Sequence, residues 1–212
     1  FFSIKGTLIF VPDKNEAVFR VNRGITKRFE SHVGNRTVYR LINDQIVAKL
    51  NPTEVFPFIT NEEILLTYLI CEYTDPSVVE CMDRDQIVKK LENLHLYYRN
   101  KQVYVIPPIF YLILTDFFEN IKNIDKFGIF PTSGFFAIIL ALLHCDVVYA
   151  YGFIDLHIPK DCYYYNKTNT PWCGLNLSYH AKHIEKTFLL AISERDDEMV
   201  YGHGILMITK PT

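Results

Sequence analysis

The turn Pro131-Thr132-Ser133-Gly134 precedes an apolar segment, 135–144. Its residue types make it the first candidate for a functional site in this sequence. A helix N-terminus offers free N–H groups and the positive end of the helix dipole, which suits an anion such as a nucleotide phosphate. Thr132 and Ser133 add hydroxyls, and Gly134 allows a ligand to approach the backbone closely. The same residue types are also preferred at helix starts that bind nothing. The turn by itself leaves both interpretations open.

His180 and Glu185 form a second candidate pair. A histidine titrates near neutral pH, so His180 could serve as a general base. A structural or solvated side chain is the alternative, because the chain has seven histidines. Five positions on a helix correspond to roughly 140° around its axis, so the two residues would not share a face. We therefore expect separate roles, with Glu185 holding a helix end or a loop.

The five cysteines form no CxxC motif and no Cys/His cluster with zinc-site spacing. Cys162 and Cys173 flank a run of three tyrosines, and a disulfide between them would close a small loop around that run. Sequons for N-glycosylation begin at Asn35, Asn166 and Asn176. Together these features favour an oxidising, secretory compartment over the cytosol.

Length and composition predict one compact domain covering residues 1–212, because 49% of the residues are hydrophobic and 15% are aromatic. The net charge is −2 and no basic stripe is present, so we expect no nucleic-acid partner. The longest apolar runs, 103–114 and 135–143, are too short to span a bilayer. The chain starts with Phe1 rather than Met, so we expect that any membrane anchor stood upstream.

Hydrophobic patterns predict the elements that must position these residues. Strands are expected at 17–21, 37–42, 102–106, 127–130 and 147–151, and helices at 61–68, 83–96, 110–121 and 135–144, with a helix-like turn at 26–34. The run 127–151 reads as strand, tight turn, helix and strand, which is typical of a parallel βαβ unit. The predicted fold class is α/β: a mostly parallel, twisted sheet with helices on both faces. In such sheets ligands bind at the carboxyl ends of the strands.

The order of these motifs resembles the animal-type sialyltransferases, most closely the beta-galactoside alpha-2,6-sialyltransferase branch. That family carries four ordered sialylmotifs. Residues 17–43 are similar to the second half of the large motif, and residues 130–153 to the small motif. Residues 162–166 look like the third motif, and His180 with Glu185 matches the very small motif.

The resemblance implies a Rossmann-like, GT-A-variant fold that transfers sialic acid from CMP-sialic acid to a glycan hydroxyl with inversion. CMP-sialic acid is then the donor substrate, and neither a cofactor nor a metal is required. His180 matches the catalytic base and Glu185 a supporting residue. The positions that match donor-binding residues are Asn22, Asn43, Thr132, Ser133, Gly134 and Tyr163. The resemblance also implies a Cys162–Cys173 disulfide and the Golgi lumen as the compartment, with secretion or the cell surface as alternatives.

The sequence departs from the family in residues 1–8, where the first half of the large motif should carry a cysteine. Cys145 matches the small-motif cysteine that would pair with it. We therefore expect Cys145 to be a free thiol or to pair with Cys71 or Cys81. Either the missing motif lies upstream, or the donor pocket has decayed. In the second case the fold would be inactive and repurposed for binding a glycan, a nucleotide or a protein.

Overall fold

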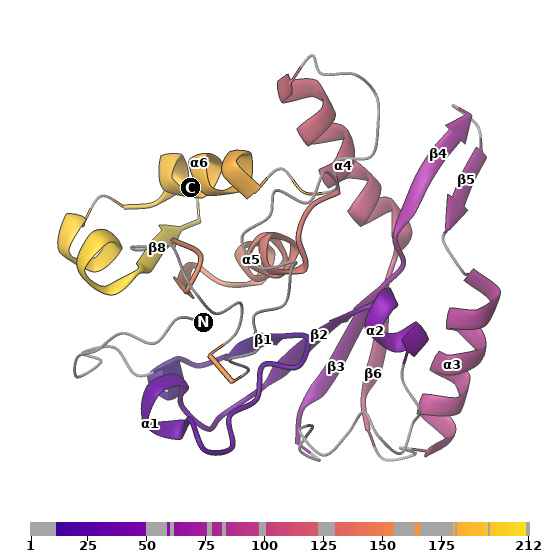
Figure 1. Ribbon diagram of the computed structural model, residues 1–212, viewed down its shortest axis with the longest axis horizontal. Helices are drawn as coiled ribbons and strands as arrows, with labels where there is room; N and C mark the ends of the chain where they lie inside the picture. Colours follow the sequence, from indigo (N-terminus) through magenta and orange to yellow (C-terminus); the bar gives the residue numbers. More distant parts are fainter. Residues whose placement is uncertain are drawn as a thin grey trace.

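Four parallel strands form the central sheet of the computed structural model (Figure 1). The structure describes residues 12–49, 59, 62–75, 78–81, 84–97, 101–122, 130–154, 164–165, 180, 182–194 and 196–210. The strands are β1 (Phe19–Val21), β2 (Tyr39–Asn43), β3 (Ile64–Tyr68) and β6 (Val103–Ile106), and they lie in the order β1-β2-β3-β6. All three pairings are parallel. This sheet confirms the predicted α/β fold class.

The prediction of a helix at 61–68 was wrong, because Ile64–Tyr68 is the strand β3. β3 lies between β2 and β6 and is therefore paired along both edges. A strand inside a parallel sheet is covered on both faces and reads as a continuous apolar run. Such a short run cannot be told from a buried helix by its periodicity. Here the pairing with β2 and β6 makes the segment a strand.

Helices flank this sheet. In the view of Figure 1, α3 lies to the right of the sheet and α5 lies above β1 and β2, and α5 packs against both of these strands. The helical elements are η1 (Pro12–Lys14), α1 (Glu30–Val33), α2 (Asp44–Lys49), α3 (Arg84–Tyr97), α4 (Pro108–Lys122), α5 (Ser133–His144), α6 (Lys182–Ile192) and η2 (Glu198–Gly202). Thus α1, α3, α4 and α5 confirm helical predictions, whereas α2 and α6 were not predicted.

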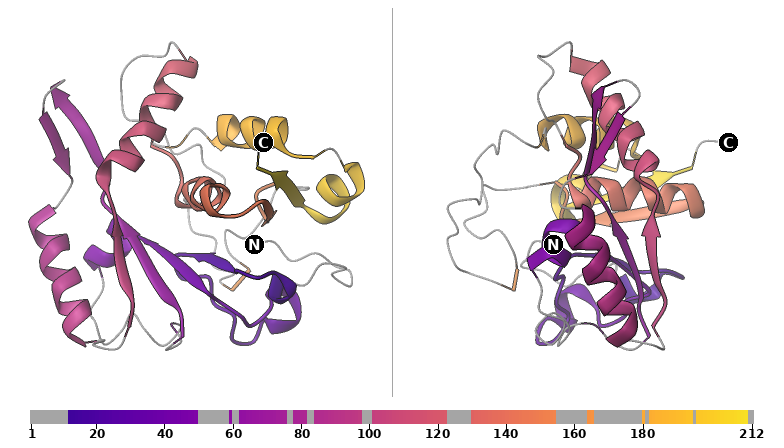
Figure 2. Two further views of the ribbon diagram at one scale, coloured as in Figure 1. Left: turned by 180° about the vertical axis from the view of Figure 1, so that it is seen from behind. Right: turned by 90° about the vertical axis from the view of Figure 1, so that its right-hand side faces the viewer.

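Two small antiparallel sheets complete the described part of the chain. β7 (Val147–Tyr151) pairs with β8 (Ile205–Thr209), on the side of α5 away from β3 and β6 (Figures 1 and 2). The strand at 147–151 is thus confirmed, and the partner that the described residues give it, β8, runs antiparallel to it. An apolar run predicts burial of a strand and not the direction of its partner. Residues 127–129 lie outside the described residues, so the first strand of the predicted βαβ unit is not described.

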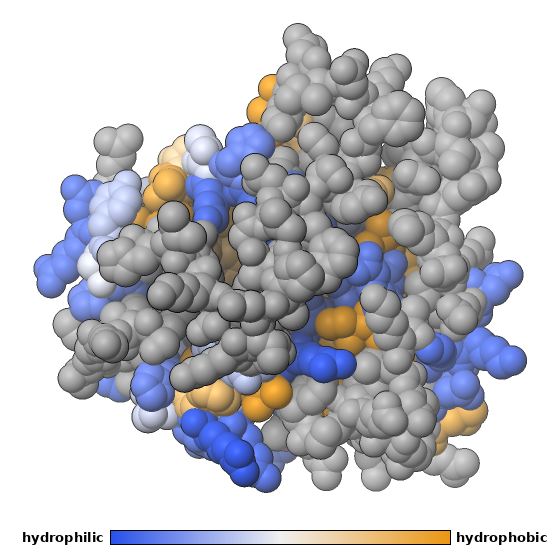
Figure 3. Space-filling model, viewed as in Figure 1, coloured by the Kyte–Doolittle hydropathy of each residue, from blue (hydrophilic) through white to orange (hydrophobic). Residues whose placement is uncertain are grey.

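Aromatic side chains dominate the hydrophobic core beneath α5. The fully buried members include Tyr68, Tyr111, Phe118, Phe135 and Phe136. Tyr68 stacks on Tyr111 with ring centroids 5.1 Å apart and contacts Phe136 at 4.6 Å. On the face shown in Figure 3, hydrophobic side chains reach the surface in separate patches with hydrophilic ones around them. Among the described residues, no helix has the length and apolar character needed to cross a bilayer.

A buried ion pair joins β2 to the residue that precedes β3. Arg40 Nε lies 2.6 Å from Glu63 Oε2, and Arg40 Nη2 donates to Oε1 at 3.1 Å. Both side chains are 1% exposed. Arg40 also donates to the carbonyls of Asn22 and Gly24, at 3.0 and 3.3 Å. One guanidinium therefore ties the start of β3 to the loop that follows β1.

Glu63→Ala should lower the free energy of unfolding by about 3–5 kcal/mol, because it leaves the buried Arg40 charge without its carboxylate. Urea unfolding followed by circular dichroism measures this. Glu62→Ala is the matched control, since the neighbouring Glu62 is exposed, and its effect should stay within about 0.5 kcal/mol. Equal losses for the two variants would contradict a special role for the pair.

Candidate active site

The N-terminus of α5 has a capping residue followed by two N–H groups that stay open in the described part of the chain. Thr132 is its N-cap, with φ −67° and ψ 151°, and its Oγ1 accepts a hydrogen bond from the Phe135 N–H at 3.1 Å. The Phe136 N–H donates to the Thr132 carbonyl at 2.9 Å. Within the described part of the chain, no hydrogen bond occupies the N–H groups of Ser133 and Gly134. These two donors and the helix dipole are available to an anion.

Glu185 holds this turn from α6. Its Oε1 accepts from the Thr132 N–H at 2.6 Å, and its Oε2 accepts from the Thr132 hydroxyl at 2.7 Å. The Glu185 side chain is buried, and burial raises its pKa above the ordinary value of 4.5, although the two Thr132 hydrogen bonds oppose this rise. With its hydroxyl hydrogen directed at Glu185, Thr132 keeps its Oγ1 lone pairs free to cap Phe135. The carboxylate therefore fixes the orientation of the N-cap.

His180 lies two residues before α6 and is attached to the same turn. Its Nδ1 is 2.7 Å from the carbonyl oxygen of Phe130. A carbonyl oxygen can only accept, so Nδ1 carries the proton and donates. In the neutral ring Nε2 then holds the lone pair and can take a proton from another molecule. Glu185 and His180 thus anchor to residues 132 and 130 of one short segment.

Tyr68 belongs to the candidate site, although it was not among the residues predicted for it. Its hydroxyl lies 2.8 Å from Ser133 Oγ, and the ring is 2% exposed. Burial raises the pKa of Tyr68 well above its ordinary value, so the hydroxyl stays protonated. Recognising 64–68 as a strand would have placed Tyr68 at a carboxyl end, where ligands bind in such sheets.

Asn22 and Asn43 lie at the carboxyl ends of neighbouring strands. Asn43 is the register partner of Tyr68, and its Oδ1 accepts from the Ile46 N–H at 2.9 Å at the start of α2. Asn22 directly follows β1 with φ 54°, and its Oδ1 accepts from the Asn43 N–H at 3.1 Å. Asparagine tolerates this left-handed conformation better than most residues. The carboxyl edge therefore presents Asn22, Asn43 and Tyr68 in a row that continues to Ser133.

Gly134 is required by packing within the protein. A Cβ atom at this position would lie 2.7 Å from Cε1 of Phe153, which is too short for two carbon atoms. Phe153 follows β7, so the turn after one strand lies directly on the first turn of α5. The sequence-based reason for this glycine was close approach of a ligand, and the structure adds close approach of an aromatic ring.

One third-motif tyrosine, Tyr164, reaches the loop after β1. The Tyr164 hydroxyl donates to the Ile25 carbonyl, and its ring packs edge-on against Phe29 with centroids 5.1 Å apart. Tyr163, Cys162, Cys173, Asn166 and Asn176 lie outside the described residues, so their predicted roles stay predictions. Asn35 is exposed.

Cys145, the C-cap residue of α5, is a free thiol in the described part of the chain. Its side chain is half-buried. Burial raises its pKa, and Asp146 and Glu16 raise it further.

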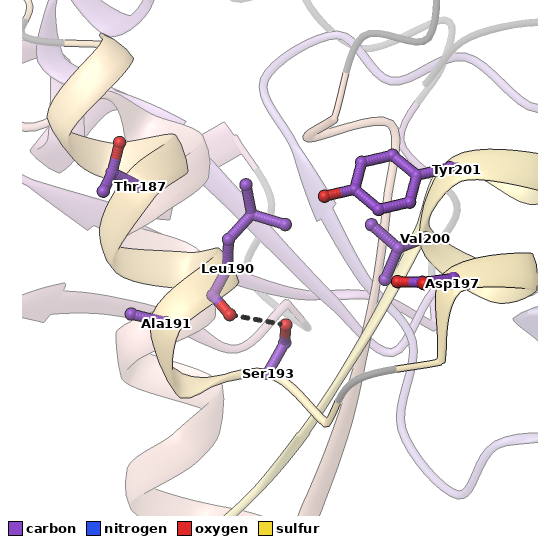
Figure 4. Close-up of a pocket in the computed structure, with 7 residues that line it drawn as sticks. All are labelled: Thr187, Leu190, Ala191, Ser193, Asp197, Val200 and Tyr201. Atoms are coloured by element: carbon purple, nitrogen blue, oxygen red, sulfur yellow. Dashed lines mark hydrogen bonds between the residues drawn. The ribbon is translucent and has the colours of Figure 1, made fainter.

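Potential metal ligands and a surface groove are two further features of the described residues. No three His, Cys, Asp or Glu side chains among them gather in a way that could hold a metal ion. A shallow groove separates the second half of α6 from η2 (Figure 4). Its lining residues are Thr187, Leu190, Ala191, Ser193, Asp197, Val200 and Tyr201. It shares no residue with the site at the start of α5.

The raised pKa of Glu185 predicts a pH dependence of stability. The folded chain holds the Glu185 proton more tightly than the unfolded chain, so the free energy of unfolding should fall as pH rises from 4.5 through the raised pKa. Glu185→Gln should remove this contribution. Urea midpoints measured between pH 4 and 7 test it, with Glu198→Gln, at an exposed position on η2, as the control. Identical pH profiles for wild type and Glu185→Gln would refute the assignment.

Comparison with known proteins gives one consistent family. Residues 4–196 match glycosyltransferase family 29 (sialyltransferase). The chain is 28% identical over 200 residues to human beta-galactoside alpha-2,6-sialyltransferase 1, covering 91% of this chain and 47% of the human protein. It is 30% identical over 201 residues to the mouse protein of the same name, covering 91% and 48%. The chain thus spans about half the length of the curated relatives it matches. It belongs to glycosyltransferase family 29, the sialyltransferases.

Proposed function

We propose that this chain transfers sialic acid from CMP-sialic acid to a hydroxyl group of a glycan, with inversion and without a required metal or cofactor. One observation carries the proposal: His180 and the start of α5 are attached to the same segment, residues 130–132. A proton acceptor and an anion-binding turn held by one segment suit a displacement in which a hydroxyl is deprotonated while a phosphate leaves.

The start of α5 would hold the phosphate of the departing CMP. Charge builds up on that phosphate as its bond to the sugar breaks, and donors fixed in advance stabilise such charge most effectively. The Ser133 and Gly134 N–H groups fit this role. Tyr68 would orient the Ser133 hydroxyl by donating to its Oγ, so that the hydroxyl hydrogen points to the phosphate.

The row at the carboxyl edge would bind the rest of the donor. The Oδ1 atoms of Asn22 and Asn43 accept backbone hydrogen bonds, so each amide group is held in place with its N–H₂ available to a ligand. Tyr163 is proposed to lie near the donor, as its neighbour Tyr164 contacts the loop after β1.

His180 would act as the base on the acceptor. Its Nδ1 proton is engaged by Phe130, so Nε2 is the atom that takes the hydroxyl proton. Glu185 would not touch substrate in this scheme, because both of its oxygens bind Thr132. It acts by positioning the turn.

The secretory pathway, with the Golgi lumen foremost, is the compartment we propose. A Cys162–Cys173 disulfide and glycosylation at Asn35, Asn166 and Asn176 belong to the same proposal. Glycan chains at these positions would be detected as a mass shift that disappears on enzymatic deglycosylation of the protein made in secretory cells.

The proposal is separated from a repurposed, inactive fold by two measurements on the same preparation. Calorimetry with CMP reports on the donor site, and transfer of labelled sialic acid from CMP-sialic acid to a galactoside reports on catalysis. Binding together with transfer supports the enzyme. CMP or glycan binding without any transfer would identify the repurposed fold instead.

Ser133→Pro should weaken CMP binding about 10- to 100-fold, because it removes one N–H donor to a charged group, a loss of roughly 1.5–3 kcal/mol. Proline is well tolerated at the first position of a helix, and the extended backbone of Thr132 suits a following proline. Ser133→Ala is the control that removes the hydroxyl alone and keeps the N–H. If both variants bind CMP like the wild type, the turn is not the phosphate site.

His180→Ala should lower the transfer rate about 10²–10⁴-fold, the usual contribution of a general base, while CMP affinity changes little. His183→Ala is the matched control, since His183 is exposed on α6, and it should keep the wild-type rate. Initial rates at saturating donor measure the effect. Full activity in His180→Ala would exclude His180 as the base.

A further inference from the structure

A β-hairpin follows β3 directly, and its two ends are both cysteines. It consists of β4 (Cys71–Asp75) and β5 (Val78–Cys81), which pair antiparallel with Cys71 opposite Cys81. We propose that Cys71 and Cys81 form a cross-strand disulfide that closes this hairpin at the carboxyl end of β3. The proposal is independent of the transfer activity.

The backbone register brings the two positions within the range that a disulfide needs. Directly opposed residues of an antiparallel pair have Cα atoms about 4.5–5.5 Å apart. Disulfides join Cα atoms about 4.4–6.8 Å apart. Opposed residues also lie on the same face of the hairpin. No backbone movement is therefore needed to join these two positions.

The pairing of β4 with β5 is weak by itself, although β4 also packs against α4. A two-stranded hairpin is marginally stable on its own in water, and β4 and β5 pair only with each other in the described part of the chain. The register also places Glu72 opposite Glu80, and like charges directly opposite each other are destabilising. The ladder shifts register between Tyr73 and Asp75. A covalent link at the base would offset these weaknesses.

The segment just before β4 is anchored in the core, and β5 ends opposite the first residue of β4. Ile70, next to Cys71, is buried, and its N–H donates to Asp44 Oδ2 at 2.9 Å. Tyr68, two residues earlier, contacts Ser133 in the candidate active site. A Cys71–Cys81 bond would fasten β5 to this anchored end. Cys145 is a free thiol among the described residues.

The bond forms by thiol–disulfide exchange. A thiolate of one cysteine attacks an oxidant disulfide, such as that of a protein disulfide oxidoreductase or oxidised glutathione, and the second cysteine resolves the mixed disulfide. Two protein thiols become one S–S bond, and one oxidant disulfide becomes two thiols. Electrons and protons balance without any other reactant.

The test equilibrates the purified chain in buffers of graded reduced and oxidised glutathione, alkylates the remaining thiols and digests with trypsin. The peptide 50–84 contains Cys71 and Cys81 and no other cysteine. We expect it unalkylated and two mass units light in oxidising buffer, and doubly alkylated after full reduction. Cys145→Ser should leave this result unchanged. Double alkylation in oxidising buffer, or a link from either cysteine to Cys145, Cys162 or Cys173, would overturn the proposal.

A stability measurement provides a second readout. For a loop of this size the bond should change the folding equilibrium constant about a hundredfold. The Cys71→Ser/Cys81→Ser variant should therefore unfold more readily than the oxidised wild type and match the wild type in reductant. A difference that persists in reductant would show that the cysteines act through packing and would contradict the disulfide. Should the variant fail to fold, the peptide map of the wild type still decides.

Discussion

The pair of hydrogen bonds between Glu185 and Thr132 is the interaction on which the site depends. It joins α6 to the start of α5 through two residues that are 53 positions apart in the sequence, and it fixes the N-cap that leaves the next two N–H groups open. Placing this carboxylate in a buried environment is costly, as its raised pKa shows. The two donors from Thr132 offset part of this cost. The position of Glu185 beside the N-cap of α5 is therefore explained better by its effect on the orientation of Thr132 than by a contribution to stability.

The rest of the fold brings strand ends to this point. The parallel sheet aligns Asn22, Asn43 and Tyr68 along one edge, and the aromatic core beneath α5 holds that helix over β1 and β2. The Arg40–Glu63 pair sets the loop after β1 relative to β3. The residues of the candidate site thus come from separate segments, but each is supported by an element whose position the core determines.

The sequence predicted the local parts of this arrangement better than the long-range ones. The start of α5 was predicted correctly because capping residues and an apolar helix are local signals. The strand β3 was missed because its burial comes from neighbours on both sides, and Tyr68 was missed with it. The antiparallel partner of β7 comes from residues 205–209, which no local pattern could assign. The contact of His180 with a backbone carbonyl has no sequence signal, since any residue at 130 supplies that oxygen.

The contact of Phe153 with Gly134 has a consequence for how sequences of this fold can vary. The ring occupies the volume that a side chain at 134 would need, so the two positions share one fixed space. A lineage that acquired alanine at 134 would need the Phe153 ring to shift or a smaller residue to replace it, whereas a smaller residue at 153 would remove this obstacle in advance. Across related sequences, residues 134 and 153 should therefore covary, and the change at 153 should come before the change at 134.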